Sequence, residues 1–499
     1  MHLHTSGIIL YLSRIATMKW VWWLFVASVC VYFLWSTWVV YGQWFLDIQT
    51  LAVIRDSVFI ALVIWWAARL WFWFFYGDAR DRGFPVGLQR LFFWRTLFIF
   101  LLFVWSLWHA RWYDVERSSL LVGVKYTLWM HLIVWWAVVV GVASCLECSW
   151  SLTTFLHHWL RRFVWVAFVI ICVWFVLQVA KFWCPDWRMS LGFGPVGDYL
   201  FGEPPPLWYR TWPGGMDRWS GIFAWPNTYG YVLAWWASMF FLGIGVLRRR
   251  YCRVGAVGRI GRTGRWLSMV LFLAVLAYFG ALILTLSRWA LVAVLVQLLL
   301  GMIAVWRWLH RIGDHTMCTV SVKRWMRLLL LLGLGGIVFV VLLSLWKWSS
   351  TMAHITQFVE SMGALVVMPR WWWLGSAGPA IHLGGMFLPE NMYLQVWLDI
   401  WFVGLLLWLA AGCVLLLLLA RVIFLFLRRK MLLVAAILFA WLLWLLALSV
   451  EGVFLHVWED TMVNYLFLGV GGWLLGCCLA YLVGKSPFDL SSHDRPQDE

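Results

Sequence analysis

Residues 267–308 read LSMVLFLAVLAYFGALILTLSRWALVAVLVQLLLGMIAVWRW, and this stretch decides the class of fold. A helix of about 20 apolar residues crosses the roughly 30 Å hydrocarbon core of a bilayer, so the stretch is too long for a single crossing. Arg288, beside Ser287, is the charged residue near its middle. We therefore expect two membrane-spanning helices, over 267–286 and 289–308, joined by a very short turn at Ser287-Arg288.

The whole chain has the composition of a membrane protein. Of its 499 residues, 64% are hydrophobic and only 12% are charged, and the mean hydropathy is +0.85. A soluble domain has roughly 45–50% apolar and about 25% charged residues. The composition excludes a soluble enzyme, a disordered chain and a disulfide scaffold. It predicts an all-α, polytopic membrane protein.

Apolar runs long enough to cross the bilayer recur along the chain, and we expect about twelve transmembrane helices. They lie near 20–41, 57–77, 91–110, 120–145, 162–182, 226–247, 267–286, 289–308, 327–346, 393–420, 431–449 and 462–483. Trp is abundant, with 46 residues. Aromatic rings favour the bilayer interface, but so many Trp side chains must also line the helices.

The net charge of +16 indicates the orientation of the spans. Most of the 38 Lys and Arg residues fall in alternate connecting segments on one side, which are 1–19, 78–95, 146–162, 248–266, 307–327, 421–430 and 484–499. Basic residues concentrate on the cytoplasmic side, so we expect both termini to be cytoplasmic. The charge orients the spans and contacts anionic membrane lipids; we expect no nucleic-acid partner.

No soluble domain interrupts the spans, so we interpret 1–499 as one integral membrane domain that ends in a cytoplasmic tail at 484–499. Two exoplasmic loops, 183–225 and 347–392, stand out by length and polarity. Long loops in a compact bundle are usually functional. Within 347–392, the large exoplasmic loop before the tenth span, we expect short helices.

One such helix is indicated over about 352–366, where apolar residues recur at helical spacing. Ser349-Ser350-Thr351 precede it as possible N-caps. We expect this amphipathic helix to lie at the membrane surface; a lid without chemistry is the alternative.

The cysteines and carboxylates predict neither a disulfide framework nor a metal site. Of ten cysteines, only Cys184 falls in an exoplasmic segment. The pair Cys145-x-x-Cys148 has no second pair or nearby His to complete a zinc site. Glu459-Asp460 is interpreted as a solvated cap. We therefore expect no metal and no cofactor.

Two arginines at exoplasmic helix ends are candidate functional residues, because charge near the membrane interior is costly and is usually retained for function. Arg218 precedes Pro226-Asn227, where Asn227 can satisfy free backbone groups at a helix start. Arg288 lies in the tight turn. Arg288 alone can also extend to lipid phosphate, as Arg at helix ends often does.

The end of the large loop supplies further candidates. Gly375 and Gly378 stand where the backbone must turn or approach a ligand. Glu390 opens the next span together with Asn391 and Tyr393. Glu390 fits either a carboxylate stabilised by the helix dipole or a general base.

Two arginines and a carboxylate on one side suit a lipid-linked diphosphate sugar. Arg is permanently charged and binds phosphate oxygens in a fork. Displacing a diphosphate from a sugar requires that its developing charge be stabilised. It also requires removal of the proton from the acceptor hydroxyl.

The motifs within about 210–410, and their order along the chain, resemble those of the O-antigen ligase and O-antigen polymerase superfamily of bacterial envelope glycosyltransferases. The segment Arg218–Gly230 resembles its Arg-x-x-Gly-x-Phe-x-x-Pro-Asn motif, and Ser287-Arg288-x-Ala290 its Ser-Arg-x-Ala turn. Gly375-x-x-Gly378-Pro379 resembles its Gly-x-Gly-Pro-Gly loop. Asn391-x-Tyr393-Leu394-Gln395, with Gly404 downstream, resembles its His-Asn-x-Tyr-Leu-Gln segment.

The resemblance implies transfer of glycan from an undecaprenyl-diphosphate carrier to a glycan or lipid acceptor, on the outer face of the bacterial cytoplasmic membrane. It implies that Arg218 and Arg288 hold the diphosphate. Glu390, or else His382, would take the acceptor proton. The residues that would shape the site are Asn227, Gly375, Gly378, Asn391 and Tyr393.

The chain departs from the family at three positions. The ligases have a His where this chain has Glu390, which fits polymerase-like members better. His354 lies where the family often has Arg, and Trp401 lies where Gly is common. A protein O-oligosaccharyltransferase of the same superfamily is a further alternative.

Two rival functions share the lipid carrier. A lipid-linked sugar flippase is expected to place charge or broken helices at mid-membrane, where Lys125 is the chief candidate and the motif-bearing spans look uninterrupted. A cell-wall glycan polymerase of the shape-and-division type would need a catalytic Asp in a large exoplasmic loop. Loop 347–392 contains no Asp.

Overall fold

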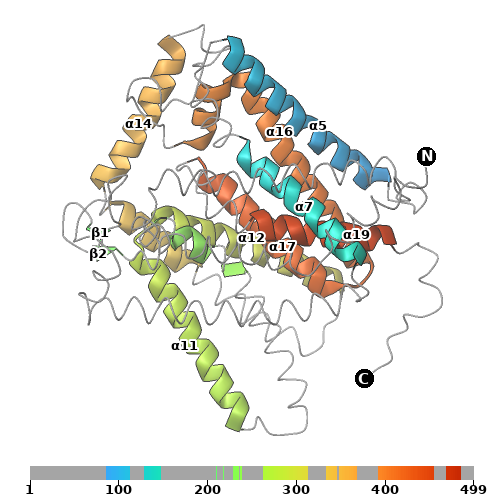
Figure 1. The fold of residues 1–499 in the computed structure, drawn as a ribbon. Helices are drawn as coiled ribbons and strands as arrows, with labels where there is room; N and C mark the ends of the chain where they lie inside the picture. The colour runs from blue at the N-terminus through green and yellow to red at the C-terminus, as the bar shows by residue number, and fades with distance from the viewer. Residues whose placement is uncertain are drawn as a thin grey trace, which may run out of the picture.

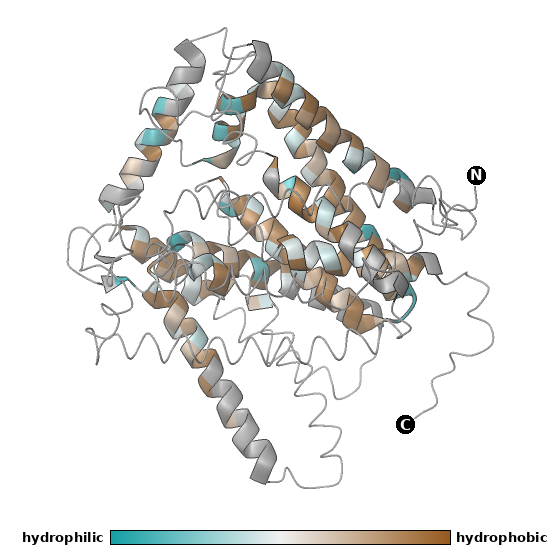
Figure 2. Cartoon of the chain, viewed as in Figure 1, coloured by the Kyte–Doolittle hydropathy of each residue, from teal (hydrophilic) through white to brown (hydrophobic). Residues whose placement is uncertain are grey.

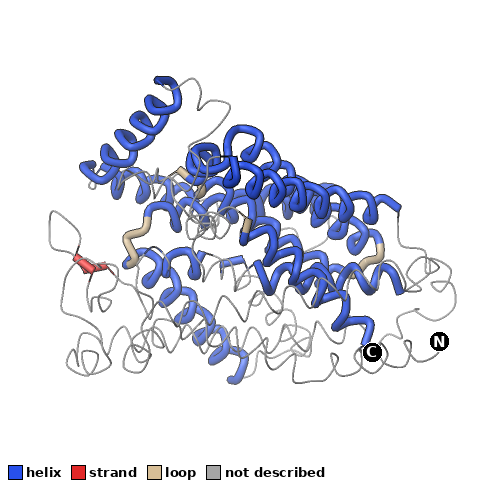
Figure 3. Tube along the Cα trace, turned by 45° about the horizontal axis from the view of Figure 1, so that its top comes forward, coloured by secondary structure: helices blue, strands red, loops and turns tan. Residues whose placement is uncertain are grey.

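The structure is a computed structural model that describes residues 86–112, 128–147, 209–210, 217–218, 227, 229–234, 237–238, 262–312, 333–345, 348–367, 391–453 and 468–484. These residues are helical apart from short turns and one antiparallel pair of two-residue strands (Figures 1 and 3). The expectation of an all-α protein is confirmed for this part of the chain.

Three of the described helices contain segments that are long and apolar enough to cross a membrane: α5 (Val86–Trp112), α16 (Met392–Arg428) and α17 (Leu432–Glu451). Four further helices accompany them, namely α7 (Trp129–Glu147), α11 (Arg262–Leu284), α12 (Arg288–Ile312) and α19 (Gly469–Gly484). Apolar residues dominate the described helices (Figure 2). The structure thus supports a membrane protein, and the twelve spans and their orientation stay predictions.

The expected split of 267–308 is present. α11 ends at Leu284, Thr285 and Leu286 form a turn, and α12 begins at Arg288. Other boundaries differ from expectation. α16 continues to Arg428, past the expected end at residue 420, because apolar residues continue between its basic side chains.

The tightest pairing of helices is between α7 and α19, and glycines make it possible. A Cβ added to Gly141 of α7 would overlap the backbone of α19, and one added to Gly476 of α19 would overlap the backbone of α7. Gly472 and Gly476 form a Gly-x-x-x-Gly motif, which lets two membrane helices approach closely. Close packing therefore dominates this pairing, and the Cys477 thiol adds a hydrogen bond to the carbonyl oxygen of Gly141 at 3.4 Å.

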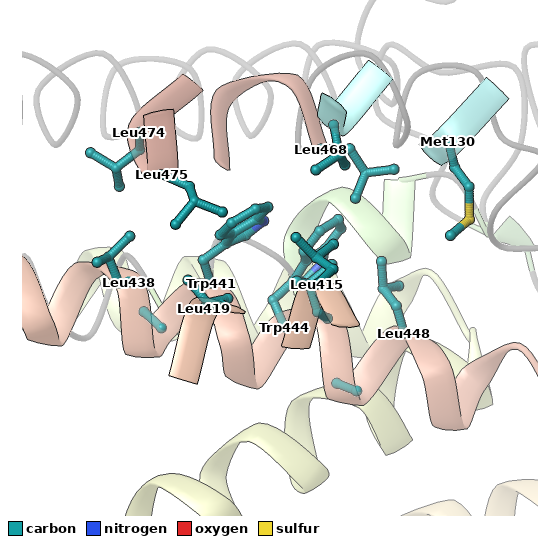
Figure 4. Close-up of a cluster of buried hydrophobic side chains, with 14 of the residues drawn as sticks. Met130, Leu415, Leu419, Leu438, Trp441, Trp444, Leu448, Leu468, Leu474 and Leu475 are labelled. Carbon is teal, nitrogen blue, oxygen red and sulfur yellow. The ribbon is translucent and has the colours of Figure 1, made fainter. Parts of the chain in front are cut away.

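The apolar core lies between α16, α17 and α19. Trp441 and Trp444 of α17 are each 1% exposed, and Figure 4 shows both rings among leucines from the surrounding helices. Gly471 of α19 leaves the room that the Trp441 ring fills. Some of the abundant Trp thus packs inside the protein rather than at the bilayer interface.

α16 is broken near its beginning. Ile400 and Trp401 leave helical geometry, and Trp401 has φ 73° and ψ 170°, a conformation that is otherwise almost confined to glycine. The rings of Tyr393 and Trp408 lie 5.8 Å apart, although 15 residues of unbroken helix would rise about 22 Å. The first segment, Met392–Asp399, therefore bends back toward the second, as the upper part of Figure 1 shows.

α5 holds this bend in place. The indole N–H of Trp105 donates a hydrogen bond to the carbonyl oxygen of Ile400 at 2.9 Å. The ring of Trp401 packs edge-on against Trp105 and Trp108, at centroid distances of 5.3 and 5.9 Å. Gly404 gives room to the Ile400 side chain. A Trp here adopts a backbone conformation that Gly adopts more readily.

The helix expected over 352–366 is confirmed as α14 (Trp348–Val367). It begins before Ser349-Ser350-Thr351, so the expectation that these residues precede the helix as N-caps is wrong; they lie in its first turn. Apolar side chains on it are exposed, including Ile355 and Val359. Its place at a membrane surface stays a prediction.

Candidate functional site

Arg218 is held by hydrogen bonds from two directions. It ends β2 (Asp217–Arg218), which pairs with β1 (Tyr209–Arg210). Its Nε donates to the carbonyl oxygen of Thr285 at 2.9 Å, and its Nη2 donates to Oδ1 of Asn227 at 2.7 Å. These bonds fix the orientation of the guanidinium plane against the turn between α11 and α12.

That turn presents Arg288. Leu286 has a positive φ of 50°, and the Ser287 N–H donates to Oγ1 of Thr285 at 3.2 Å. Arg288 begins α12 and is only 6% exposed, with its guanidinium carbon 5.7 Å from the centre of the Trp289 ring. Arg288 is thus enclosed by the protein, and its contact with lipid phosphate stays an alternative prediction.

A glycine brings the segment after Asn227 against the same turn. A Cβ on Gly230 would lie 2.8 Å from the Cβ of Ala290 and 3.1 Å from the Cβ of Ser287. Only a residue without a side chain permits this approach. The structure thus brings three predicted site residues, Arg218, Asn227 and Arg288, into one group, which we call the arginine cluster.

Asn391 and Tyr393 belong to a second group at the start of α16. Asn391 is the N-cap, and its Oδ1 accepts a hydrogen bond from the Leu394 N–H at 3.0 Å. The Tyr393 hydroxyl donates a hydrogen bond to the carbonyl oxygen of Ser449 at 2.6 Å, and the Met392 N–H donates one to the carbonyl oxygen of Gly452 at 3.0 Å. Both bonds dock the first turn of α16 onto the end of α17. We call this contact the α16–α17 junction.

The sequence assigned no role to two buried polar residues at this junction. Glu451, the last residue of α17, is 0% exposed, and Gln395 of α16 is 1% exposed. Neither side chain has a hydrogen-bond partner in the described part of the chain. The sequence does show that Glu451 follows the apolar run 431–449, but an acidic residue at that position is equally typical of the exposed end of a membrane-spanning helix.

Two further buried polar residues lie deeper. Arg95 of α5 is 1% exposed, and His131 of α7 is 0% exposed, with its ring 5.4 Å from that of Trp408. Arg95 falls in segment 78–95, which the sequence predicts to be cytoplasmic, and the structure places it within α5, which begins at Val86.

The remaining predicted site residues, Glu390, His382, Gly375 and Gly378, lie outside the described residues. The described helices do show where the two groups stand. α12 packs on α17, and Figure 1 shows the start of α12 and the end of α17 on the same side of the bundle, together with β2. The arginine cluster and the junction thus belong to one end of the molecule.

The chemistry available at this end is anion binding by two guanidinium groups, and hydrogen bonding by a carboxyl and an amide. No group of three potential metal ligands occurs within the described ranges. Comparison with protein-family models, with curated proteins and with solved structures gives no match.

Proposed function

We propose that the protein transfers oligosaccharide from an undecaprenyl-diphosphate carrier to a glycan or lipid acceptor on the outer face of the bacterial cytoplasmic membrane. The arginine cluster is the observation that carries the proposal. Arg218 is oriented by Asn227 and Thr285, and Arg288 follows three residues after Thr285 at the start of a helix. Two oriented guanidinium groups match the two phosphates of a diphosphate.

The reaction is a single displacement. The diphosphate leaves the anomeric carbon of the donor sugar while Arg218 and Arg288 stabilise the charge that develops on it. The acceptor hydroxyl attacks that carbon and loses its proton to a base, for which the sequence offers Glu390 and His382. Asn391 and Tyr393, together with Gly375 and Gly378, shape the acceptor side.

The proposal includes a topology. About twelve spans, cytoplasmic termini and an exoplasmic loop at 347–392 place both site groups on the outer face. Glu390, in the position of the ligases' His, favours a polymerase over a ligase; transfer to a protein is the remaining variant of the same reaction.

A lipid-linked sugar flippase is the second candidate, and one observation favours it. The expectation that the motif-bearing spans are uninterrupted is wrong for α16, which breaks at Ile400-Trp401. Broken helices and buried charges, such as Arg95, are features of transporters. The arginine cluster favours the transferase because it holds two cations beside one turn, where they suit the two phosphates of the donor.

Activity of the purified protein in detergent separates the two functions. The assay combines undecaprenyl-diphosphate glycan with an acceptor and follows glycan transfer. A flippase moves its substrate between two sides of a membrane and yields no product in detergent. Absence of product from the wild-type protein, across the acceptors of a ligase, a polymerase and a protein glycosyltransferase, would contradict the proposal.

Arg288→Ala tests the arginine cluster. Removal of one group that stabilises the leaving charge lowers turnover by about 100-fold or more. Arg421→Ala is the matched control, because Arg421 is exposed on α16 in the segment expected to be cytoplasmic. Equal turnover in the two variants would remove Arg288 from the diphosphate site.

A further inference from the structure

The α16–α17 junction encloses hydrogen-bonding capacity that the reaction above does not use. Both carboxyl oxygens of Glu451, and both the oxygen and the nitrogen of the Gln395 amide, are buried without a partner among the described residues. Buried polar groups in proteins are nearly always hydrogen-bonded. Two such side chains at one junction therefore indicate a site that a ligand completes.

The two side chains belong to the two elements that meet at the junction, Gln395 to the first segment of α16 and Glu451 to the end of α17. Gln395 follows Met392 by three residues, so both occupy the same face of the first segment of α16. The Met392 N–H binds the carbonyl oxygen of Gly452, the residue next to Glu451, and Tyr393 binds that of Ser449. These bonds hold the first turn of α16 against the last turn of α17.

The chemistry of the two groups selects the ligand. An ionised carboxylate only accepts hydrogen bonds, whereas an amide both donates and accepts. A hydroxyl donates and accepts as well, so a hydroxyl-rich sugar satisfies both side chains. Neither side chain offers a positive charge to a phosphate, which separates this site from the arginine cluster.

We propose that Glu451 and Gln395 bind the acceptor sugar through its hydroxyls, and that Glu451 takes the proton of the hydroxyl that attacks. This inference rests on the proposed function. The acceptor O–H bond breaks and its proton goes to a Glu451 oxygen. The acceptor oxygen bonds to the anomeric carbon, and the bond from that carbon to the diphosphate oxygen breaks. Its electron pair leaves with undecaprenyl diphosphate.

The assignment moves the base from Glu390 or His382 to a residue that the fold fixes. The end of α17 and the start of α12 share one side of the bundle (Figure 1). Donor phosphates at Arg218 and Arg288, and an acceptor at Glu451, therefore approach from neighbouring elements at the same end.

The test compares Glu451→Gln, Glu390→Gln and Gln395→Leu with wild-type protein in the detergent transfer assay. Glu451→Gln preserves the shape of the side chain and removes its basicity, so turnover falls about 100-fold or more, as expected for loss of a general base. Gln395→Leu raises the acceptor KM with a smaller change in turnover. Glu360→Gln, on the exposed face of α14, is the control and keeps the wild-type rate.

Binding of labelled undecaprenyl diphosphate shows which variants keep a folded donor site. Glu451→Asp keeps a carboxyl group, so we expect its turnover to exceed that of Glu451→Gln. Full turnover in Glu451→Gln, with Arg288→Ala inactive, would overturn the inference and leave the proposed function standing. If Glu451→Gln lost both donor binding and turnover, the inference would also be overturned, since the residue would then have a structural role. No transfer by wild-type protein would contradict the proposed function itself.

Discussion

The two arginines of the cluster are positioned by neighbours of different kinds. Arg218 depends on hydrogen bonds to Asn227 and to the backbone of Thr285, so its place follows from side-chain chemistry. Arg288 depends on the turn itself, because Leu286 must adopt a positive φ and the segment at Gly230 must lie against Ala290. Small residues near the turn are therefore as important for the geometry as the charged ones.

Gly230→Ala tests this dependence. The added methyl group meets Ala290 at 2.8 Å and Ser287 at 3.1 Å, and overpacking of this kind lowers stability by about 1–3 kcal/mol. Gly280→Ala in α11 is the matched control, since nothing lies within 4 Å of the added carbon and the better helix propensity of Ala stabilises slightly. Thermal unfolding in detergent measures both variants. Equal unfolding temperatures would show that the segment does not press on the turn.

At the scale of elements, the break in α16 organises the α16–α17 junction. It turns the first helical segment back, so that Met392 and Tyr393 contact the end of α17. Trp105 and Trp108 of α5 support the break, and this gives part of the Trp surplus a structural reason. An indole combines a large apolar ring with one N–H donor, which is what a freed carbonyl inside an apolar bundle requires.

Trp105→Phe isolates that donor. The ring still fills its space, but the carbonyl oxygen of Ile400 loses its hydrogen bond, and an unpaired buried group lowers stability by about 1–3 kcal/mol. Trp94→Phe, at an exposed position on the same helix, changes stability little. The unfolding temperatures of the two variants in detergent test this prediction. An unfolding temperature of Trp105→Phe equal to that of the wild type would mean that the carbonyl oxygen of Ile400 has another hydrogen-bond partner.

The sequence predicted the helices better than their interactions. Lengths of apolar runs located α17 and the turn at Ser287-Arg288, because crossing a bilayer fixes the length of a helix. They could not reveal the break at Trp401, since 393–420 is a continuous apolar run and the Trp105 donor lies 295 residues from Ile400. Glu451 was missed for a similar reason: its burial depends on α16, which no local pattern encodes.

For the whole molecule, charge predicts opposite sides for the two ends of α17. Arg428, Arg429 and Lys430 precede this helix, while Glu451 ends it. The arginine cluster and the junction lie at the Glu451 end, so the proposed reaction needs that end to face outward. The turn at Lys430 must then face the cytoplasm.

Single cysteines in a cysteine-free background test the orientation. Val453→Cys and Lys430→Cys place a thiol at exposed positions just beyond the two ends of α17. A membrane-impermeant maleimide added to spheroplasts labels Val453→Cys, and it labels Lys430→Cys only after the membrane is permeabilised. The reverse result would place the arginine cluster inside the cell and exclude transfer at the outer face.

The close pairing of α7 with α19 also bears on how the bundle assembles during synthesis. The glycine surface of α7 around Gly141 is made early, but its partner around Gly472 and Gly476 leaves the ribosome more than three hundred residues later. α5 packs against α16, and α12 packs against α17, so each of these partners is also synthesised later. The early helices must therefore stay inserted without their final neighbours, and the described bundle closes only when its last helix enters the membrane.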